Sequence, residues 1–469
     1  MKQTRKPVGL FLILFVSPLL FLLSCGEKEK SSSNNTSTQS STCVPKRTST
    51  SVTKSSHKVQ TKRSKNSLMA FSGSNRTLTA STIVPLLVVR VQYANATFQS
   101  SQTTWADKIF GTSEGQLNHY MAETTYNKYQ FAPITETSGT TNDGVVTVTM
   151  SGNHPDTRNG DYDCYAAAAI TEADSYVNFA AYDNDSNDNL SVSELQVIFL
   201  VAGGESASSI NSPGGVWGMA TSLFCDSDGD GGVSAKSGEY WLTLDNVSLM
   251  GRKDSAYGQN GFSQFGERQG SSLSNNWDAT IGVMAHELGH AYFDLPDLYD
   301  TCIPATYAGI GYFGLMGSGS WGYKSLSEKS GATPIHLSAW SKEKIGACDP
   351  QLVDNGTNNI TLPAVYQRSI HAASCGIYKA TTSTSDEYFL FENRSPGGYD
   401  RGLYFRILYG SHDSIFSNND ELYTGGVAIW HVKDILSSCF YLTTNNCCLL
   451  YTSDAADERS SVDLGGRRI

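Results

Sequence analysis

Two histidines, His286 and His290, enclose a glutamate in the run HELGH. In a helix, residues four apart lie on the same face, so both imidazoles can converge on one metal ion. Glu287 lies beside them, where it can hold a water molecule and accept its proton. The HExxH pattern therefore predicts a catalytic zinc helix; a surface helix with two unrelated histidines is the alternative.

The sequence around this run has helical spacing from Ile281 onward. Its apolar residues would form a stripe that packs into the core: Ile281, Met284, Ala285 and Leu288. The two histidines would lie on a different face. Either Asp278 or Thr280 is available to cap the start of the helix.

Two histidines leave a zinc site incomplete, because catalytic zinc normally has three protein ligands and an open position. Three carboxylates follow the helix: Asp294, Asp297 and Asp300. Pro296 cannot continue the helix, so the chain should turn near Phe293 and return one of these carboxylates to the metal.

The segment 286–300, HELGHAYFDLPDLYD, resembles the active-site signature of the immune inhibitor A family of secreted metallopeptidases, which are metzincin-like. The resemblance implies that His286 and His290 bind zinc, that Glu287 is the general base, and that Asp297 is the third ligand. Two positions depart from the family pattern. The stretch from His290 to Asp297 is one residue longer than usual, and Asp294 replaces the expected glycine, so Asp294 stays the alternative ligand.

A second part of the resemblance lies downstream. The run 311–321, GYFGLMGSGSW, resembles the methionine turn of the family, which implies that Met316 forms an apolar floor under the zinc and is not a ligand. Pro334–Trp340 resembles the helix that follows this turn. The resemblance covers residues 83–434.

The rest of the chain predicts an α/β (α+β) fold with a mixed sheet and an active-site helix, followed by a smaller β-rich region. Short apolar runs indicate strands at Ile83–Val89, Val145–Met150 and Leu195–Val201. Helical spacing indicates helices at Gly115–Tyr129 and Ala166–Ala180. We therefore expect a metzincin-like catalytic domain at 81–350.

Beyond residue 350 the helical patterns thin out, and Glu387–Glu392 and Val427–Val432 have the composition of strands. This predicts a β-rich part of the peptidase region at 351–446. Residues 447–469 differ from everything before them and resemble translated adapter read-through; an ordinary charged tail is the alternative.

The N-terminus predicts export. A basic start and the apolar run Leu10–Leu23 are typical of a signal peptide over residues 1–24, and Cys25 follows a small residue as in a bacterial lipobox. We expect a lipid on Cys25, with the Ser/Thr/Lys-rich segment 25–80 as a disordered tether. Gly26 favours the outer membrane or cell surface. An ordinary signal peptide is the alternative.

A polar loop in the first half of the chain has the spacing of an EF-hand calcium loop, with Asp188 where a glycine is usual. Its candidate ligands are Asp183, Asp185, Asn187, Asn189 and Glu194. No helix is predicted after it, so it would be an EF-like loop. A second, partial cluster contains Asp226, Asp228 and Asp230.

Composition excludes one class of partner. The formal net charge is −11, whereas nucleic-acid binding needs a basic surface. The 10 cysteines contain no CxxC pair, so a zinc ribbon is excluded, and export permits disulfides whose pairing is open.

These features together predict a zinc-dependent endopeptidase that also binds calcium, cleaves extracellular proteins or peptides and is held at a membrane by a lipid. A calcium-stabilised surface-binding protein with an inactive peptidase fold is the first alternative. A zinc hydrolase of non-peptide bonds is the second.

Overall fold

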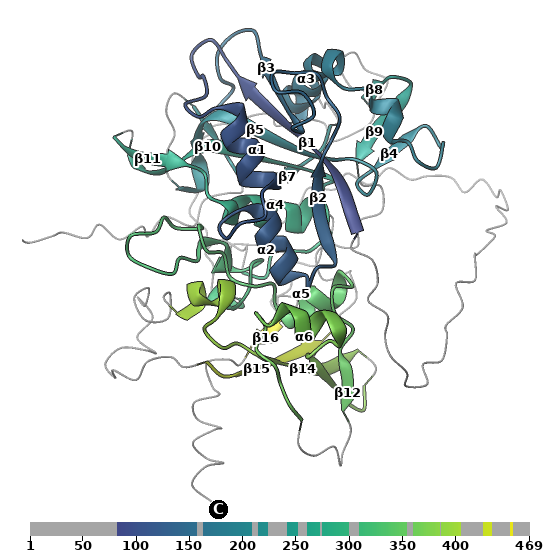
Figure 1. Ribbon diagram of the computed structural model, residues 1–469, viewed down its shortest axis with the longest axis vertical. Helices are drawn as coiled ribbons and strands as arrows, with labels where there is room; N and C mark the ends of the chain where they lie inside the picture. The colour runs from purple at the N-terminus through teal and green to yellow at the C-terminus, as the bar shows by residue number, and fades with distance from the viewer. Residues whose placement is uncertain are drawn as a thin grey trace, which may run out of the picture.

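The computed structural model describes residues 82–156, 163–208, 214–223, 242–251, 260–272, 274–299, 309–353, 360–384, 386–404, 425–433 and 451–453. Within these residues the chain has the mixed α/β architecture that the sequence predicts. Figure 1 shows the large sheet in the upper part of the view, the smaller C-terminal sheet in the lower part, and α4 between them. The signal peptide, Cys25 and the tether lie outside the described residues.

The strands are β1 (Thr82–Gln92), β2 (Tyr129–Pro133), β3 (Val145–Thr149), β4 (Asn189–Ser191), β5 (Gln196–Glu205), β6 (Gly215–Val216), β7 (Met219–Thr221), β8 (Thr243–Leu244), β9 (Val247–Gly251), β10 (Phe262–Ser272), β11 (Asn275–Asp278), β12 (Gln351–Val353), β13 (Tyr378–Thr381), β14 (Glu387–Asn393), β15 (Val427–Lys433) and β16 (Tyr451–Ser453). The α-helices are α1 (Gln102–Phe110), α2 (Leu117–Thr124), α3 (Asp163–Ala173), α4 (Ile281–Ala291), α5 (Ala339–Lys344) and α6 (Arg368–Ala373). Short 3-10 helices are η1 (Asp174–Tyr176), η2 (Phe179–Tyr182), η3 (Ser206–Ser208), η4 (Gly311–Phe313), η5 (Ser318–Trp321) and η6 (Gly398–Asp400).

The large sheet has the strand order β11-β10-β5-β1-β2, with β3 paired to β1, β6 to β5 and β7 to β10. Its central strands β10, β5 and β1 are parallel, and the edge strand β11 is antiparallel to β10. Side chains alternate between its two faces. Val84, Leu86 and Val88 pack in one core cluster, which also contains residues of α1, α2 and α4. Leu87, Val89 and Val91 pack in the second cluster, with α3.

Three predicted helices are shorter in the structure. The helix expected at Gly115–Tyr129 covers only α2, because Tyr126 and Asn127 adopt positive φ angles of 55° and 64° that end it before β2. The helix expected at Ala166–Ala180 ends with α3 at Ala173 and continues as η1 and η2. After the methionine segment, Pro334–Leu337 is not helical, and α5 begins at Ala339.

The C-terminal sheet has the order β12-β13-β14-β15-β16, and its strands β14 and β15 confirm the two strands predicted there. Its inward residues Leu390, Trp430 and Val432 belong to the same core cluster as α4. One hydrophobic core therefore joins the C-terminal sheet to the face of the large sheet that carries α4. A disulfide joins Cys348 and Cys375, whose Cα atoms are 5.3 Å apart.

Buried His371 is neutral in this region. Its Nε2–H donates to the backbone oxygen of Ala364 at 3.0 Å, and its Nδ1 accepts from the N–H of Gly376 at 3.2 Å. Its ring stacks on Tyr126 with centroids 4.3 Å apart. Burial lowers the pKa of His371 to about 4, and the charge of Lys342 acts in the same direction.

Within the described part of the chain, no helix is both long and apolar enough to cross a membrane.

Candidate active site

Helix α4 carries the HExxH run and is buried along its whole length. Of the two proposed caps, Thr280 occupies the N-cap position with an extended backbone, but its hydroxyl accepts no N–H of the helix and instead donates to the backbone oxygen of Ser330. Asp278 lies in β11, where it pairs with Arg268. The two histidines, although polar, are only 7% and 5% exposed.

The structure brings His286, His290 and Asp297 together. The Nε2 atoms of the two histidines lie 3.2 Å apart. Oδ1 of Asp297 lies 3.1 Å from Nε2 of His286 and 3.2 Å from Nε2 of His290. The three candidate ligand atoms therefore form a nearly equilateral triangle.

This triangle fits a zinc ion. Zinc bonds to nitrogen and oxygen are about 2.0–2.1 Å long, and the edge of a tetrahedron is about 1.63 times that length, or roughly 3.3–3.4 Å. The observed edges of 3.1–3.2 Å are within a few tenths of an ångström of this value. Two imidazoles and one carboxylate are also a donor set that catalytic zinc uses.

Backbone carbonyls orient both histidines. Nδ1 of His286 lies 2.9 Å from the oxygen of Leu315, and Nδ1 of His290 lies 2.6 Å from the oxygen of Leu295. A carbonyl only accepts, so each Nδ1 carries the proton and each Nε2 is directed to the triangle. Such partners fix the tautomer and ring orientation of metal-binding histidines.

The charges of the cluster are mutually dependent. Desolvation opposes ionisation of Asp297, but His290 and His286 outweigh it and hold the pKa of this carboxyl well below its usual range. Desolvation also opposes protonation of His290, yet the Asp297 carboxylate raises the pKa of that histidine. The cluster thus favours one anionic carboxylate facing positive charge, which a divalent cation can supply.

Glu287 is 6% exposed and lies next to the triangle. Burial raises its pKa to about 8; the charge of His286 lowers it, and those of Asp297 and Glu205 raise it. A methyl group placed on Gly218 would come within 3.4 Å of Oε1 of Glu287, so the bare backbone at Gly218 forms one wall beside this carboxyl.

The alternative ligand Asp294 does not belong to the triangle. The potential ligand atoms that lie within 4.8 Å of one another come from Asp297 and the two histidines. Asp294 has a φ of 56°, and its N–H donates to the oxygen of His290. This left-handed backbone explains why glycine suits the position and why aspartate, which tolerates that conformation better than most residues, can replace it. Asp300 lies outside the described residues.

Met316 packs directly under α4 and is 0% exposed. A Cβ placed on Gly289 would lie 2.4 Å from Sδ of Met316, so the absence of a side chain at Gly289 is what allows this approach. The backbone oxygen of Met316 accepts from the N–H of Leu298, one residue past Asp297. Met316 therefore lies where an apolar floor of the site is expected, next to the helix and the ligand loop.

Sequence reasoning missed two neighbours of the site. The ring of Tyr299 lies against that of His286 with centroids 6.3 Å apart, and burial and the charge of Asp297 raise the pKa of its hydroxyl. Tyr299 is part of the quoted LPDLYD run, which could have identified it. Glu205 is fully buried at the end of β5 and accepts from the N–H groups of Ala207, Gly218 and Gly266. No local pattern identifies it.

The polar loop in which the sequence predicts calcium ligands brings three carboxylates together. Carboxylates of Asp183, Asp185 and Glu194 lie close enough together to hold one cation. Asp188, at the position usually taken by glycine, has a φ of 59°, as that position requires. Asn187 and Asn189 lie in the same loop and bond to its backbone. The cluster Asp226, Asp228 and Asp230 lies outside the described residues.

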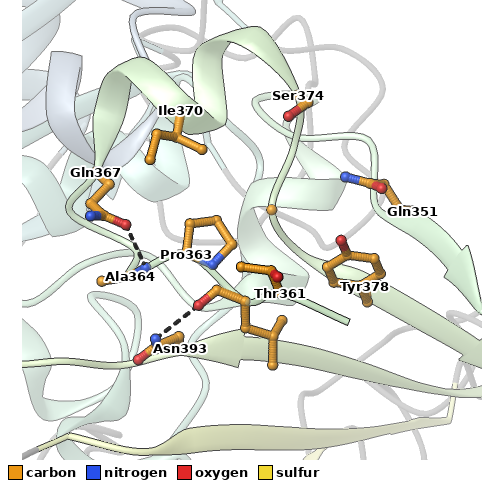
Figure 2. A pocket seen from close by; sticks show the side chains of 11 residues that line it. Gln351, Thr361, Pro363, Ala364, Gln367, Ile370, Ser374, Tyr378 and Asn393 are labelled. Atoms are coloured by element: carbon orange, nitrogen blue, oxygen red, sulfur yellow. Dashed lines mark hydrogen bonds between the residues drawn. The ribbon is translucent and has the colours of Figure 1, made fainter. Parts of the chain in front are cut away.

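A separate pocket of about 500 Å³ lies in the C-terminal region (Figure 2). None of the residues that line it belongs to α4 or to the loop that carries Asp297. Its lining amides are already bonded within the protein: Asn393 donates to the oxygen of Leu362, and Gln367 accepts from the N–H of Ala364. This pocket is not part of the metal cluster.

Comparison with known proteins agrees with this geometry. Residues 224–348 match the family model described as immune inhibitor A peptidase M6, catalytic domain. This part of the chain is therefore similar to an M6 metallopeptidase domain. The match includes α4, the ligand loop and Met316, so it confirms the resemblance that the HExxH region suggested.

Individual relatives match over shorter stretches. The chain is 42% identical over 66 residues to the pre-pro-metalloprotease PrtV from two strains of Vibrio cholerae serotype O1. These 66 residues are 14% of this chain and 7% of that protein. Among solved structures, OgpA from Akkermansia muciniphila is similar with a TM-score of 0.28 and 14% identity, over 69% of this chain and 75% of that one. A likeness at this level carries no argument about fold or function.

Proposed function

We propose that this chain is a zinc-dependent endopeptidase with a metzincin-type site, which cleaves extracellular proteins. The observation that carries the proposal is the triangle of His286, His290 and Asp297, whose edges of 3.1–3.2 Å fit tetrahedral zinc, beside the buried carboxyl of Glu287. The M6 family match supports the hydrolysis of peptide bonds.

The residues of the site divide the work of hydrolysis. Zinc, when bound, supplies a Lewis acid that polarises the scissile carbonyl and acidifies water. Glu287 accepts the proton of the attacking water and delivers it to the leaving amine. Helix α4 holds this carboxyl directly beside the two histidines, so one group can reach both the attacking water and the leaving amine. The Leu315 and Leu295 carbonyls keep both histidine rings in place throughout.

The experiment compares the full chain with Glu287→Ala, using casein as the substrate and measuring zinc content of both proteins. The proposal expects casein cleavage by the wild type and a loss of at least ~100-fold in the variant with zinc retained, since general-base catalysis typically contributes 10²–10⁴-fold. A wild-type chain that holds zinc but cleaves neither casein nor other proteins would favour the binding-protein alternative.

We propose that the loop 183–194 binds calcium. Support comes from its three converging carboxylates and from the left-handed backbone at Asp188. Calcium should raise the thermal unfolding temperature of the wild type, and this rise should be absent in Glu194→Gln. An equal rise in both proteins would contradict the assignment.

We propose export with lipidation at Cys25, on the strength of the N-terminal sequence pattern. The Cys348–Cys375 disulfide agrees with an oxidising compartment. Metabolic labelling with a palmitate analogue should mark the wild type and not Cys25→Ser; labelling of both would show that the lipid is elsewhere.

A further inference from the structure

A buried pair of opposite charges lies at the C-terminal end of the core. Arg394 follows β14 directly, and Asp400 is the last residue of η6; they are 1% and 0% exposed. Nε of Arg394 donates to Oδ2 of Asp400 at 2.6 Å, and Nη2 donates to Oδ1 at 2.8 Å. These two bonds fix the plane of the guanidinium group.

The same pair bonds to two backbone groups close to Leu315, those of Phe313 and His336. Nη1 of Arg394 donates to the backbone oxygen of Phe313 at 2.6 Å. Oδ1 of Asp400 accepts from the backbone N–H of His336 at 3.3 Å. The oxygen of His336 in turn accepts from the N–H of Leu315 at 3.2 Å. The pair therefore holds Leu315 in two ways: Arg394 bonds to Phe313, two residues before it, and Asp400 bonds to His336, whose oxygen accepts from the Leu315 N–H.

Leu315 matters because its oxygen accepts the Nδ1–H of His286 at 2.9 Å. If this oxygen moved, the imidazole of His286 would rotate and its Nε2 would leave the triangle with His290 and Asp297. We propose that Arg394 and Asp400 are positioning residues of the metal site, which fix the Leu315 carbonyl and thereby the orientation of His286. This inference rests on the proposed zinc function.

A purely stabilising role explains the pair less well. Removing two charges from water costs about as much as their attraction returns, so a buried ion pair adds little net stability. Besides the bond of Arg394 to Glu392, this pair bonds to the backbone of Phe313 and His336, which lie near Leu315 in sequence or bond to it.

The same buried network offers a matched control. Nε1 of Trp430 donates to Oε1 of Glu392 at 2.9 Å, and that oxygen also accepts from Nη1 of Arg394. Trp430 is 0% exposed, but neither of these bonds reaches Phe313 or Leu315. Trp430→Phe therefore disturbs the network and its packing without breaking a bond to the segment that orients His286.

The experiment uses the full chain as wild type, Arg394→Met, Asp400→Asn and Trp430→Phe. Cobalt(II) replaces zinc as a spectroscopic probe, and zinc affinity is measured by competition with a chromophoric chelator. Loss of a direct partner of a metal-binding histidine typically costs 10–100-fold in affinity, so the loss of a group that acts on that partner only through intervening backbone should cost less, about threefold to tenfold. We expect this loss, and a changed cobalt absorption spectrum, in the first two variants and not in Trp430→Phe.

Several results would overturn the inference. Unchanged cobalt spectra and zinc affinities in folded Arg394→Met and Asp400→Asn would do so, and so would an equal change in Trp430→Phe. If Arg394→Met does not fold, Asp400→Asn decides, because it can keep an oxygen for the His336 N–H but removes the charge and one of the two acceptors of Arg394. A wild type that binds neither metal would refute the proposed function as well, whereas zinc binding with unaffected variants refutes this inference alone.

Discussion

Replacing Gly289 with alanine tests the contact between the zinc helix and the methionine segment. The new Cβ would lie 2.4 Å from Sδ and 3.0 Å from Cε of Met316, closer than non-bonded atoms approach. Because Met316 is 0% exposed, its side chain cannot move into solvent. The substitution must therefore displace Met316 or bend α4.

Two opposing effects set the magnitude. Alanine is favoured over glycine in a helix interior by about 1 kcal/mol. Extra atoms in a packed core cost about 1–3 kcal/mol. We expect a net loss of stability of up to ~2 kcal/mol instead of the usual gain.

Met316→Ala alone should cost about 2–5 kcal/mol, as for other buried large-to-small changes. In the double variant the added methyl group occupies the space that Met316 vacates, so the overpacking cost disappears. The double variant should therefore be more stable than the sum of the single effects by about 1–3 kcal/mol.

The assay is urea unfolding of the four proteins, followed by tryptophan fluorescence. Zinc affinity is measured in parallel and should fall in Gly289→Ala, because Met316 follows Leu315, whose oxygen orients His286. The reasoning is refuted if Gly289→Ala stabilises the protein by the full propensity gain, or if the two substitutions are additive.

Three further predictions follow from single contacts. Asp297→Asn should weaken zinc binding at least ~10-fold, whereas Asp294→Asn should leave it within about twofold, as measured by chelator competition; the reverse order would assign the third ligand to Asp294. Burial lowers the pKa of His371 to about 4, so between pH 6.5 and 4 the unfolded chain binds a proton that the folded chain does not. The free energy of unfolding should therefore fall by up to ~3 kcal/mol as the pH decreases through this window. A free energy of unfolding that does not change with pH there would contradict the prediction. Cys348→Ser opens a crosslink between residues 27 apart and should cost about 3–4 kcal/mol in urea unfolding under non-reducing conditions; an unchanged free energy of unfolding would contradict this.

The features that sequence predicted are local ones. The HExxH run and the LPD run lie within a dozen residues, so helix geometry and one turn suffice to bring His286, His290 and Asp297 together. Apolar runs identified β1 and β5 because strands buried on both faces contain few polar residues.

The features that sequence missed depend on long-range contacts. Asp400 and Arg394 reach the backbone of Phe313 and His336 across more than sixty positions, and no local pattern connects them. The pairing of Cys348 with Cys375 was one of many possibilities among 10 cysteines.

Two departures from motif patterns have a shared physical explanation. Asp188 in the polar loop and Asp294 before LPD both stand where glycine is usual, and both adopt a left-handed backbone, with φ of 59° and 56°. Aspartate accepts this conformation more readily than most residues, because its short side chain bonds locally. The departures therefore preserve the turns that the motifs need.

The most direct test of the account is the zinc content of the full chain after dialysis against trace zinc, measured by mass spectrometry for the wild type and for a variant with both His286→Ala and His290→Ala. The account predicts about one zinc per wild-type chain and almost none in the double variant, because catalytic zinc needs three protein ligands. A folded wild type without zinc, or a double variant that retains it, would contradict the assignment of the site.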